Sequence, residues 1–294
     1  MIKSFINYIK YEKRYSENTV ISYLNDISQF YKFLEDNYSL EDINLVTHFM
    51  LRSWVVSLMK NKMSPKSVNR KISSIRMFFL FLKRENKIEN NPTKKIIAPK
   101  IGKTLPKFIR KSEIDNLLDN VLKPVAYPEL RDKLIINLLY NTGMRKNEMI
   151  NLHDKDIDFI NKTILVTGKG NKQRIIPVTD SLLIEIEEFI NKRNIFFEGS
   201  IKDFLFLTDK GNKLYPKFVY NVVFKNLSMV SSSDKRSPHV LRHSIATHLS
   251  DENVEINALK ALLGHSSLSS TQIYTHNSIE KLKKAYVEAH PKAK

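Results

Sequence analysis

The pattern of apolar positions predicts helices over roughly the first hundred residues. One series recurs at spacings of three and four, as side chains on one helix face do: Val20, Leu24, Ile27, Tyr31 and Leu34. A second series has a similar spacing: Val68, Ile72, Ile75, Phe79 and Leu82. Ser64-Pro65 precedes the second series and is typical of an N-cap followed by proline at the first helical position.

The periodicity fades between Asn86 and Pro106, where turn residues alternate with lysines. Such a stretch is typical of an interdomain linker. We therefore expect a helical domain over residues 1–90, a linker over 91–106 and a second domain over 107–294.

The second domain is predicted to combine helices with a β-hairpin. A helix is expected from Ser112, and an apolar helix through Leu134–Tyr140 should end at Asn141-Thr142-Gly143. β-branched residues then flank the glycine-rich turn Gly168-Lys169-Gly170-Asn171, a strong hairpin signal. The predicted fold class is mainly α, with a small antiparallel β-sheet in the second domain.

Composition changes this picture through charge and through the absence of cysteine. The 294 residues carry a formal net charge of +17, +10 of it (19 basic less 9 acidic residues) in residues 1–104. Such an excess favours nucleic acid as a partner, with an anionic membrane surface second and mere lysine-rich composition as the alternative. No cysteine is present, which excludes disulfides, thiol catalysis and cysteine-based zinc sites. No membrane span or export signal is evident, so a cytoplasmic location is expected.

Several ionisable residues of the second domain stand beside turns or helix ends. Arg145 follows Thr142-Gly143-Met144, and Lys169 lies between two glycines of the hairpin turn. Taken alone, each is more often structural, and the turn lacks the Lys-Ser/Thr pair of a nucleotide-binding loop. His239 and Arg242 are three residues apart at the start of a predicted helix, where anions bind well.

Two further candidates lie near the end of the chain. Gly264 is a natural helix C-cap, with His265 just beyond it, and Tyr274 falls early in the next predicted helix. His239 and His243 are spaced as a metal-binding pair could be, but no carboxylate has the right helical spacing, so no metal site is expected.

Together these residues resemble the active-site motifs of the tyrosine site-specific recombinases, the phage integrase family. The order and local wording match at Thr142-Gly143-Met144-Arg145, in the Lys169 hairpin, at His239-x-x-Arg242, in Leu263-Gly264-His265, and in Gln272-Ile273-Tyr274. All six expected active-site positions are filled: Arg145, Lys169, His239, Arg242, His265 and Tyr274. Asn18 to Leu34 is similar to the start of the family's core-binding domain, and Ala289 to Ala293 is similar to the ending of its Xer subgroup.

The resemblance implies a two-domain DNA clamp that cuts and rejoins DNA through a 3′-phosphotyrosine at Tyr274, without metal, ATP or any other cofactor. The implied partners are a double-stranded recombination site, three further protomers in a homo- or hetero-tetramer, and a septal DNA translocase. The implied role is chromosome dimer resolution. The alternatives are an integrase of a mobile element, a type IB topoisomerase and a catalytically silent DNA-binding protein. No extra N-terminal arm-binding domain is expected, which favours the Xer role.

Outside the six positions, we expect DNA contacts from basic residues on the second predicted helix and in the hairpin: Lys66, Arg70, Lys71 and Lys172. A solvated helix surface is the simpler explanation of the first three. The chain continues for 20 residues beyond Tyr274 (294 − 274). An apolar face formed by Leu282, Ala285, Tyr286 and Ala289 predicts a helix. The family resemblance implies that this helix packs into a neighbouring protomer, and the alternative is that it folds back on its own domain.

Overall fold

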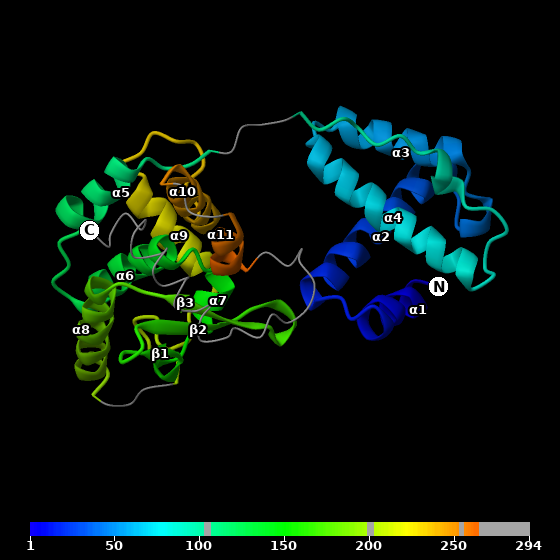
Figure 1. Cartoon of the computed structure of the whole chain (residues 1–294). Coiled ribbons are helices and arrows are strands. Elements are labelled where there is room, and N and C mark those ends of the chain that lie inside the picture. The colour runs from blue at the N-terminus through cyan, green and yellow to red at the C-terminus, as the bar shows by residue number, and fades with distance from the viewer. Residues whose placement is uncertain (103–106, 199–202, 253–255, 265–294) are drawn as a thin grey trace. The chain divides into compact units, whose positions relative to one another are not determined.

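The computed structural model describes residues 1–102, 107–198, 203–252 and 256–264. The chain divides into an N-terminal unit, Met1–Thr104, and a C-terminal unit, Leu105–Lys294 (Figure 1). Each has its own hydrophobic core. Described helices and a small sheet confirm the predicted fold class.

The N-terminal unit is helical throughout its described secondary structure. Its α-helices are α1 (Ile2–Asn7), α2 (Glu17–Tyr38), α3 (His48–Lys60) and α4 (Pro65–Arg84). Shorter π and 3-10 segments are η1 (Tyr8–Glu12), η2 (Ile43–Leu45) and η3 (Pro92–Lys95). Helix α4 packs against both α2 and α3. Aromatic rings from α1, η1 and α4 fill the core beside them, with Phe5 within 5.5 Å of both Phe78 and Phe81, centroid to centroid.

The pattern predicted α4 well and α2 less well. Ser64 caps α4 by accepting a hydrogen bond from the Ser67 backbone N–H, as expected. All five apolar positions predicted for α4 are buried. On α2, however, Leu24 is 38% exposed, and Phe30 is buried instead. The two positions lie about 120° apart around the helix, on opposite sides of the predicted apolar face, and only the packing partner decides which side faces the core.

Part of the expected linker packs on the N-terminal unit. Arg76 and Asn69 of α4 donate hydrogen bonds to the carbonyls of Ile96 (2.6 Å) and Pro99 (3.0 Å). Ile96 is itself buried. The carbonyl oxygens of an extended segment can accept hydrogen bonds from a neighbouring helix as well as from water. Loss of helical periodicity therefore did not mean that this segment is detached from the N-terminal unit.

In the C-terminal unit, several helices pack around a central helix, α6 (Tyr127–Thr142). Its α-helices are α5 (Lys111–Asn116), α6 (Tyr127–Thr142), α7 (Lys146–Ile150), α8 (Asp180–Phe196), α9 (Pro216–Leu227), α10 (Pro238–Asp251) and α11 (Ile256–Leu263). Shorter segments are η4 (Leu117–Val121), η5 (Asp154–Asp156) and η6 (Lys169–Asn171). Helices α8, α9 and α10 all pack on α6, which is buried from Leu134 to Thr142 and mainly apolar there.

An antiparallel sheet of three strands, in the order β1-β2-β3, adjoins these helices (Figure 1). The strands are β1 (Ile157–Asp158), β2 (Thr163–Thr167) and β3 (Gln173–Pro177). The β2–β3 register pairs Thr163 with Pro177 and Thr167 with Gln173. The predicted hairpin is thereby confirmed, and its tip is the short turn η6, in which Gly170 has a φ of +75°.

Candidate active site

Arg145 lies where the central helix gives way to the next helix. Helix α6 ends at Thr142, and Arg145 is the N-cap residue of α7. Glu148 fixes it twice, because its carboxylate accepts from the Arg145 backbone N–H (2.7 Å) and from Nη1 (2.9 Å). Nη2 donates to the Gly264 carbonyl (3.2 Å). The side chain is still 48% exposed, so it keeps donors for an anion.

Arg242 approaches the same place from α10. It is buried at 6% exposure and donates to the carbonyls of Gly143 (2.5 Å) and Leu263. Burial, followed by the charges of Arg145 and Arg174, lowers the pKa of Arg242 to about 10. The group stays cationic at neutral pH, but its charge is stabilised less than in water. An anion bound beside Arg145 and Arg242 would relieve that cost.

His239 lies in the first turn of α10, three residues before Arg242, and is exposed. Its ring meets that of His243 edge to face, with the centroids 4.4 Å apart. The N-terminal end of a helix also carries a partial positive charge, which favours a nearby phosphate. The position therefore suits a group that works on an anionic substrate.

Lys169 opens the turn η6 at the tip of the hairpin. The structure describes its backbone and not its side chain. The Gly168 N–H donates to the Lys172 carbonyl (2.8 Å), which closes the turn. His265 and Tyr274 lie outside the described residues, as do Leu282, Ala285, Tyr286 and Ala289. Of the six expected positions, Arg145 and Arg242 are thus the pair that the described structure brings together.

Arg174 was not among the expected site residues, although it lies on the second strand of the predicted hairpin. It lies on β3 with a side chain only 7% exposed and forms a two-pronged ion pair with Glu148. The signal was available in the sequence, because side chains alternate along a strand and Arg174 shares its side with Ile176. An arginine on the inward side of a strand requires a buried partner.

Glu148 is the carboxylate at the centre of this cluster. Burial alone would raise its pKa, but the hydrogen bonds and charge of Arg174, together with the bonds from Arg145, hold its pKa below the usual range. It is therefore ionised at neutral pH. Arg145 and Arg174 bond this one carboxylate, and Arg242 lies near enough to interact with its charge. The local excess of positive charge favours binding of a phosphodiester.

The four expected DNA contacts differ in their surroundings. Lys66 and Lys172 are exposed. Arg70 is half-exposed, and its guanidinium already pairs with Asp26 (2.5 Å). Lys71 does not lie on an exposed face as expected. It is buried at 4% exposure, and its ammonium donates to Asp26 (2.9 Å) and Gln29 (2.5 Å).

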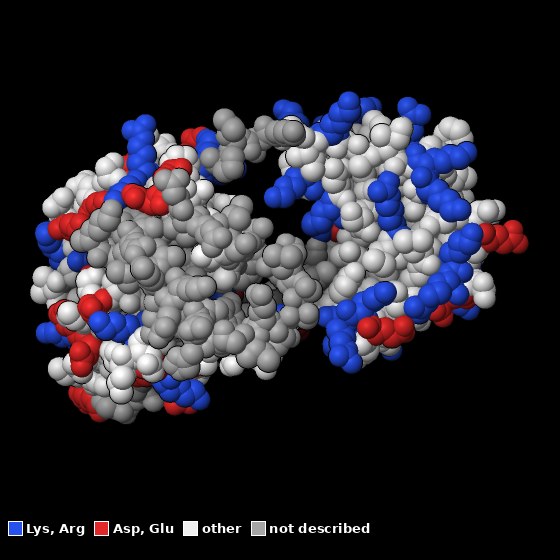
Figure 2. Space-filling model, viewed as in Figure 1, with Lys and Arg blue, Asp and Glu red and all other residues white. Residues whose placement is uncertain are grey.

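The correction for Lys71 has a clear physical reason. Position 71 follows Val68 by three residues and precedes Ile75 by four, so it lies on the buried face of α4. Asp26 on α2 neutralises it and also accepts from Ser74 (2.8 Å). The side chain therefore joins α2 to α4 and is not a phosphate contact. Figure 2 shows other Lys and Arg side chains spread widely over the viewed face of this unit.

We expect Lys66→Ala to weaken DNA binding and Lys71→Ala to weaken the fold. Lys66→Ala should lower the slope of log K against log salt for DNA binding by about 0.9, the effect of one lost phosphate contact. Lys71→Ala should leave that slope unchanged and destabilise the fold by about 2 kcal/mol, because Asp26 loses a buried charged donor. Salt titrations of DNA affinity and urea unfolding of both variants measure this. A reduced slope in Lys71→Ala would contradict the structural assignment.

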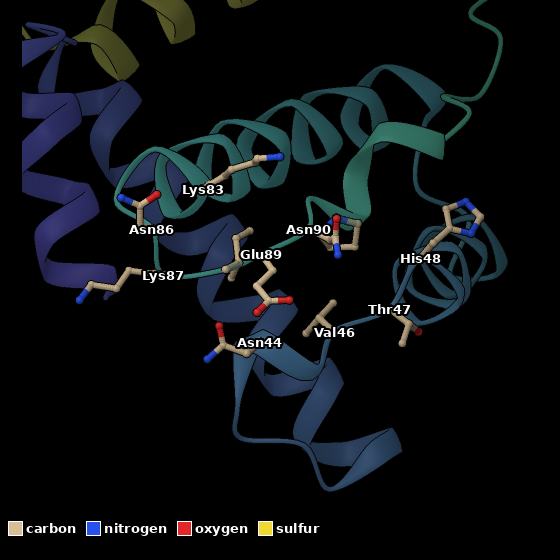
Figure 3. Close-up of a pocket in the computed structure, with 11 residues that line it drawn as sticks. Asn44, Val46, Thr47, His48, Lys83, Asn86, Lys87, Glu89 and Asn90 are labelled. Carbon is tan, nitrogen blue, oxygen red and sulfur yellow. The ribbon is translucent and has the colours of Figure 1, made fainter.

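A pocket of about 790 Å³ lies in the N-terminal unit, between the segment around Asn44–His48 and the region after α4 (Figure 3). Polar and charged side chains of both signs line it, including Lys83, Lys87 and Glu89. None of the expected site residues is among the residues that line it. In the described ranges, no three His, Asp or Glu side chains gather as they would around a metal ion. None of the helices described is long and apolar enough to cross a membrane.

Both units match models of known protein families. The family model described as the phage integrase family matches residues 107–281, and the phage integrase N-terminal SAM-like domain matches residues 2–86. The tyrosine recombinase XerC of Oceanobacillus iheyensis is 38% identical, covering 99% of this chain and 96% of that protein. The protein of the same name from Bacillus subtilis is 34% identical, with the same coverage.

Solved structures show the same fold at lower identity. The XerH site-specific recombinase bound to its difH substrate has a TM-score of 0.70 at 22% identity, over 95% of this chain and 93% of that one. The Tn1549 transposon integrase in complex with transposon right end DNA has a TM-score of 0.72 at 18% identity, over 96% and 98%. With both domain models matched and near-complete relatives above 30% identity, the chain belongs to the phage integrase family and is a tyrosine recombinase, an enzyme that breaks and rejoins DNA strands.

Proposed function

We propose that this recombinase acts in the Xer manner, exchanging strands at a short chromosomal site to resolve chromosome dimers. The observation that supports its phosphodiester chemistry is that Arg145, at the start of α7, and Arg242, on α10, lie close together. Their two positive charges favour a bound phosphate. The near-complete XerC relatives favour the chromosomal role. In this proposal residues 1–90 are the core-binding domain, 91–106 the linker, and 107–294 the catalytic domain with a C-terminal interaction helix.

The two arginines would stabilise the transition state of strand cleavage. The pentavalent phosphorus gathers negative charge on its non-bridging oxygens, and forked guanidinium donors match that geometry. Arg145 is half-exposed and positioned by Glu148, so it needs little reorganisation when the phosphate arrives. We assign His265 a further hydrogen bond to the same oxygens.

The nucleophile in this proposal is the Tyr274 hydroxyl. Its oxygen attacks phosphorus while His239 accepts its proton, and the bond from phosphorus to the 5′-oxygen breaks. The products are a 3′-phosphotyrosine and a free 5′-hydroxyl. Lys169 would supply the proton of that hydroxyl, since an ammonium can give up a proton near neutral pH and a guanidinium cannot. The covalent bond preserves the energy for rejoining, which explains why ATP is not needed.

We further propose that four protomers assemble on two duplexes and that a septal translocase regulates them. Double-stranded DNA is the partner, with Lys66, Arg70 and Lys172 as candidate contacts. This role requires the enzyme in the cytoplasm, with the chromosome. The alternative, integration of a mobile element by the same chemistry, is less favoured, because the near-complete relatives are XerC recombinases. The same chemistry without exchange of partners would be that of a type IB topoisomerase.

One experiment separates these functions. The purified protein is incubated with fragmented DNA of its own genome, covalent complexes are trapped by denaturation, and the attached sequences are read. We expect one dominant palindrome-like chromosomal site, and plasmids carrying two copies should recombine. A site at the ends of a mobile element would favour the integrase. Relaxation of plasmids that lack the site, without recombination, would favour the topoisomerase.

Deletion of residues 279–294 should block recombination while sparing binding to a half-site. In the proposed assembly this segment packs into the neighbouring protomer, a head-to-tail contact that can close into a ring. Mobility-shift titrations on half-sites and full sites measure the effect, and we expect loss of cooperativity on full sites. A truncated protein that still binds full sites cooperatively and recombines them would contradict the role. Loss of half-site binding would favour a helix folded back on its own domain.

A further inference from the structure

The ion pair between Arg174 and Glu148 lies at the junction of three elements. Both side chains are buried, at 7% and 4% exposure, and two parallel bonds of 3.0 and 2.9 Å join them. The third donor, Nε of Arg174, bonds the Leu262 carbonyl at the end of α11 (3.0 Å). One guanidinium thus links strand β3, helix α7 and helix α11.

Stability alone does not account for this pair. Removing two charges from water costs more than their attraction usually returns, and apolar side chains of similar volume often serve a core equally well. The neighbouring inward position on β3, Ile176, is filled in that way. A buried pair at this place is better explained by the geometry that it imposes.

Two glycines enclose the pair, and both immediately precede proposed catalytic residues. A Cβ on Gly168, before Lys169, would lie 3.2 Å from Glu148 Oε1. A Cβ on Gly264, before His265, would lie 3.1–3.3 Å from Cδ, Nε and Nη1 of Arg174. Gly264 also has a φ of +64°, which side chains rarely adopt. The backbone before each residue therefore packs directly on one member of the pair.

The end of α11 is held by three arginines in succession. Arg174, Arg242 and Arg145 donate to the carbonyls of Leu262, Leu263 and Gly264, respectively. Cations are favourable at this negative end of a helix. Arg145 and Arg242 are also assigned to the scissile phosphate in the proposed function. Of the three, Arg174 is then the one left to hold α11 during the reaction.

We propose that Arg174 is a positioning residue that fixes the Lys169 turn and Gly264, the residue before His265, relative to Arg145. It acts through Glu148 on one side and through the end of α11 on the other, and it does not touch the DNA. The inference rests on the proposed roles of Lys169, His265 and Tyr274. The consequence is that Arg174 controls the rate of cleavage and not the affinity for DNA.

Arg193 offers a matched control within the same unit. It is 1% exposed, forms a two-pronged pair with Asp154 (2.9 and 2.6 Å), and donates to the Leu205 carbonyl (2.9 Å). Its neighbours include none of the proposed catalytic residues. Arg193→Met and Arg174→Met thus each remove a buried guanidinium from a two-pronged ion pair. Asp154, the partner of Arg193, is 44% exposed, and only Arg174 adjoins the site.

The test measures half-site affinity, melting temperature and single-turnover cleavage of a half-site trap substrate. Arg174→Met should bind DNA within about twofold of wild type and cleave about 100-fold more slowly, the effect of displacing groups by about 1 Å. A 5′-bridging phosphorothiolate, which needs no general acid, should restore only part of that loss. Arg174→Lys should recover part of the rate, because it restores the charge with one donor. Arg193→Met should have a lower melting temperature than wild type and a cleavage rate within about threefold of the wild-type rate.

Several results would overturn the proposal. One is cleavage by Arg174→Met within about threefold of wild type. Another is a loss that merely follows half-site binding or the folded fraction, with Arg193→Met losing as much. Full recovery on the phosphorothiolate would mean that Arg174 serves Lys169 alone. If Arg174→Met does not fold, Arg174→Lys decides, because a wild-type rate in it removes the need for the two-pronged pair. Wild-type protein that forms no Tyr274-dependent adduct would overturn the proposed function instead.

Discussion

Tyr274→Phe should abolish covalent attachment to DNA and leave half-site affinity nearly intact. The substitution removes a single oxygen, the proposed nucleophile, whereas binding depends on many phosphate contacts spread over both units. No other hydroxyl is expected to replace it, because the site aligns one attacking group with the leaving oxygen. Denaturing gels of trapped complexes, read beside mobility shifts on the same DNA, give both quantities.

A different tyrosine provides the control for this prediction. Tyr215 is exposed, lies just before α9 and is assigned no part in the reaction, so Tyr215→Phe should form adducts at the wild-type rate. A normal yield of adduct from Tyr274→Phe would refute the assignment of the nucleophile. Loss of DNA binding in parallel with the adduct would show that the hydroxyl contributes to the fold or to binding.

Lys169→Ala should slow cleavage of ordinary DNA by about 1,000-fold, within the range for loss of a general acid. The same variant should cleave a 5′-bridging phosphorothiolate at close to the wild-type rate. A thiolate departs without a proton, so the acid becomes dispensable. Single-turnover rates on the two substrates, compared between variant and wild type, measure this directly.

Lys172 lies in the same turn and is exposed, which makes Lys172→Ala the natural comparison. A lysine that only contacts phosphate should lose affinity, and lose it equally on the oxygen and sulfur substrates. If Lys169→Ala behaves in that way too, with no advantage for the phosphorothiolate, Lys169 positions DNA and another group protonates the leaving oxygen.

Local sequence signals predicted much of the architecture. The Ser64-Pro65 start of α4, its apolar face and the hairpin around Gly168 all depend on neighbours within a few residues, and the structure confirms them. What failed depends on distant partners. Lys71 looked like surface because its counter-charge, Asp26, lies 45 residues away on α2.

The candidate site shows the same division. Motif wording identified Arg145 and Arg242, and the structure brings them together. It did not identify Arg174, whose importance follows from three partners on separate elements. Strand alternation could have placed that side chain inward, but no local rule names Glu148 and the end of α11 as what it meets there.

The buried pair of Glu148 and Arg174 also constrains how this protein can change over generations. Losing Glu148 leaves the buried Arg174 guanidinium without its carboxylate, and losing Arg174 leaves Glu148 with the bonds from Arg145 alone. Breaking a buried pair costs about 3–5 kcal/mol, a large share of a domain's whole stability. Drift at one position is therefore tolerated only with a compensating substitution at the other. Gly168 and Gly264 are subject to the same constraint, because a Cβ on either glycine would crowd a side chain of the ion pair. Four positions scattered over 117 residues (264 − 148 + 1) are thus expected to change only together.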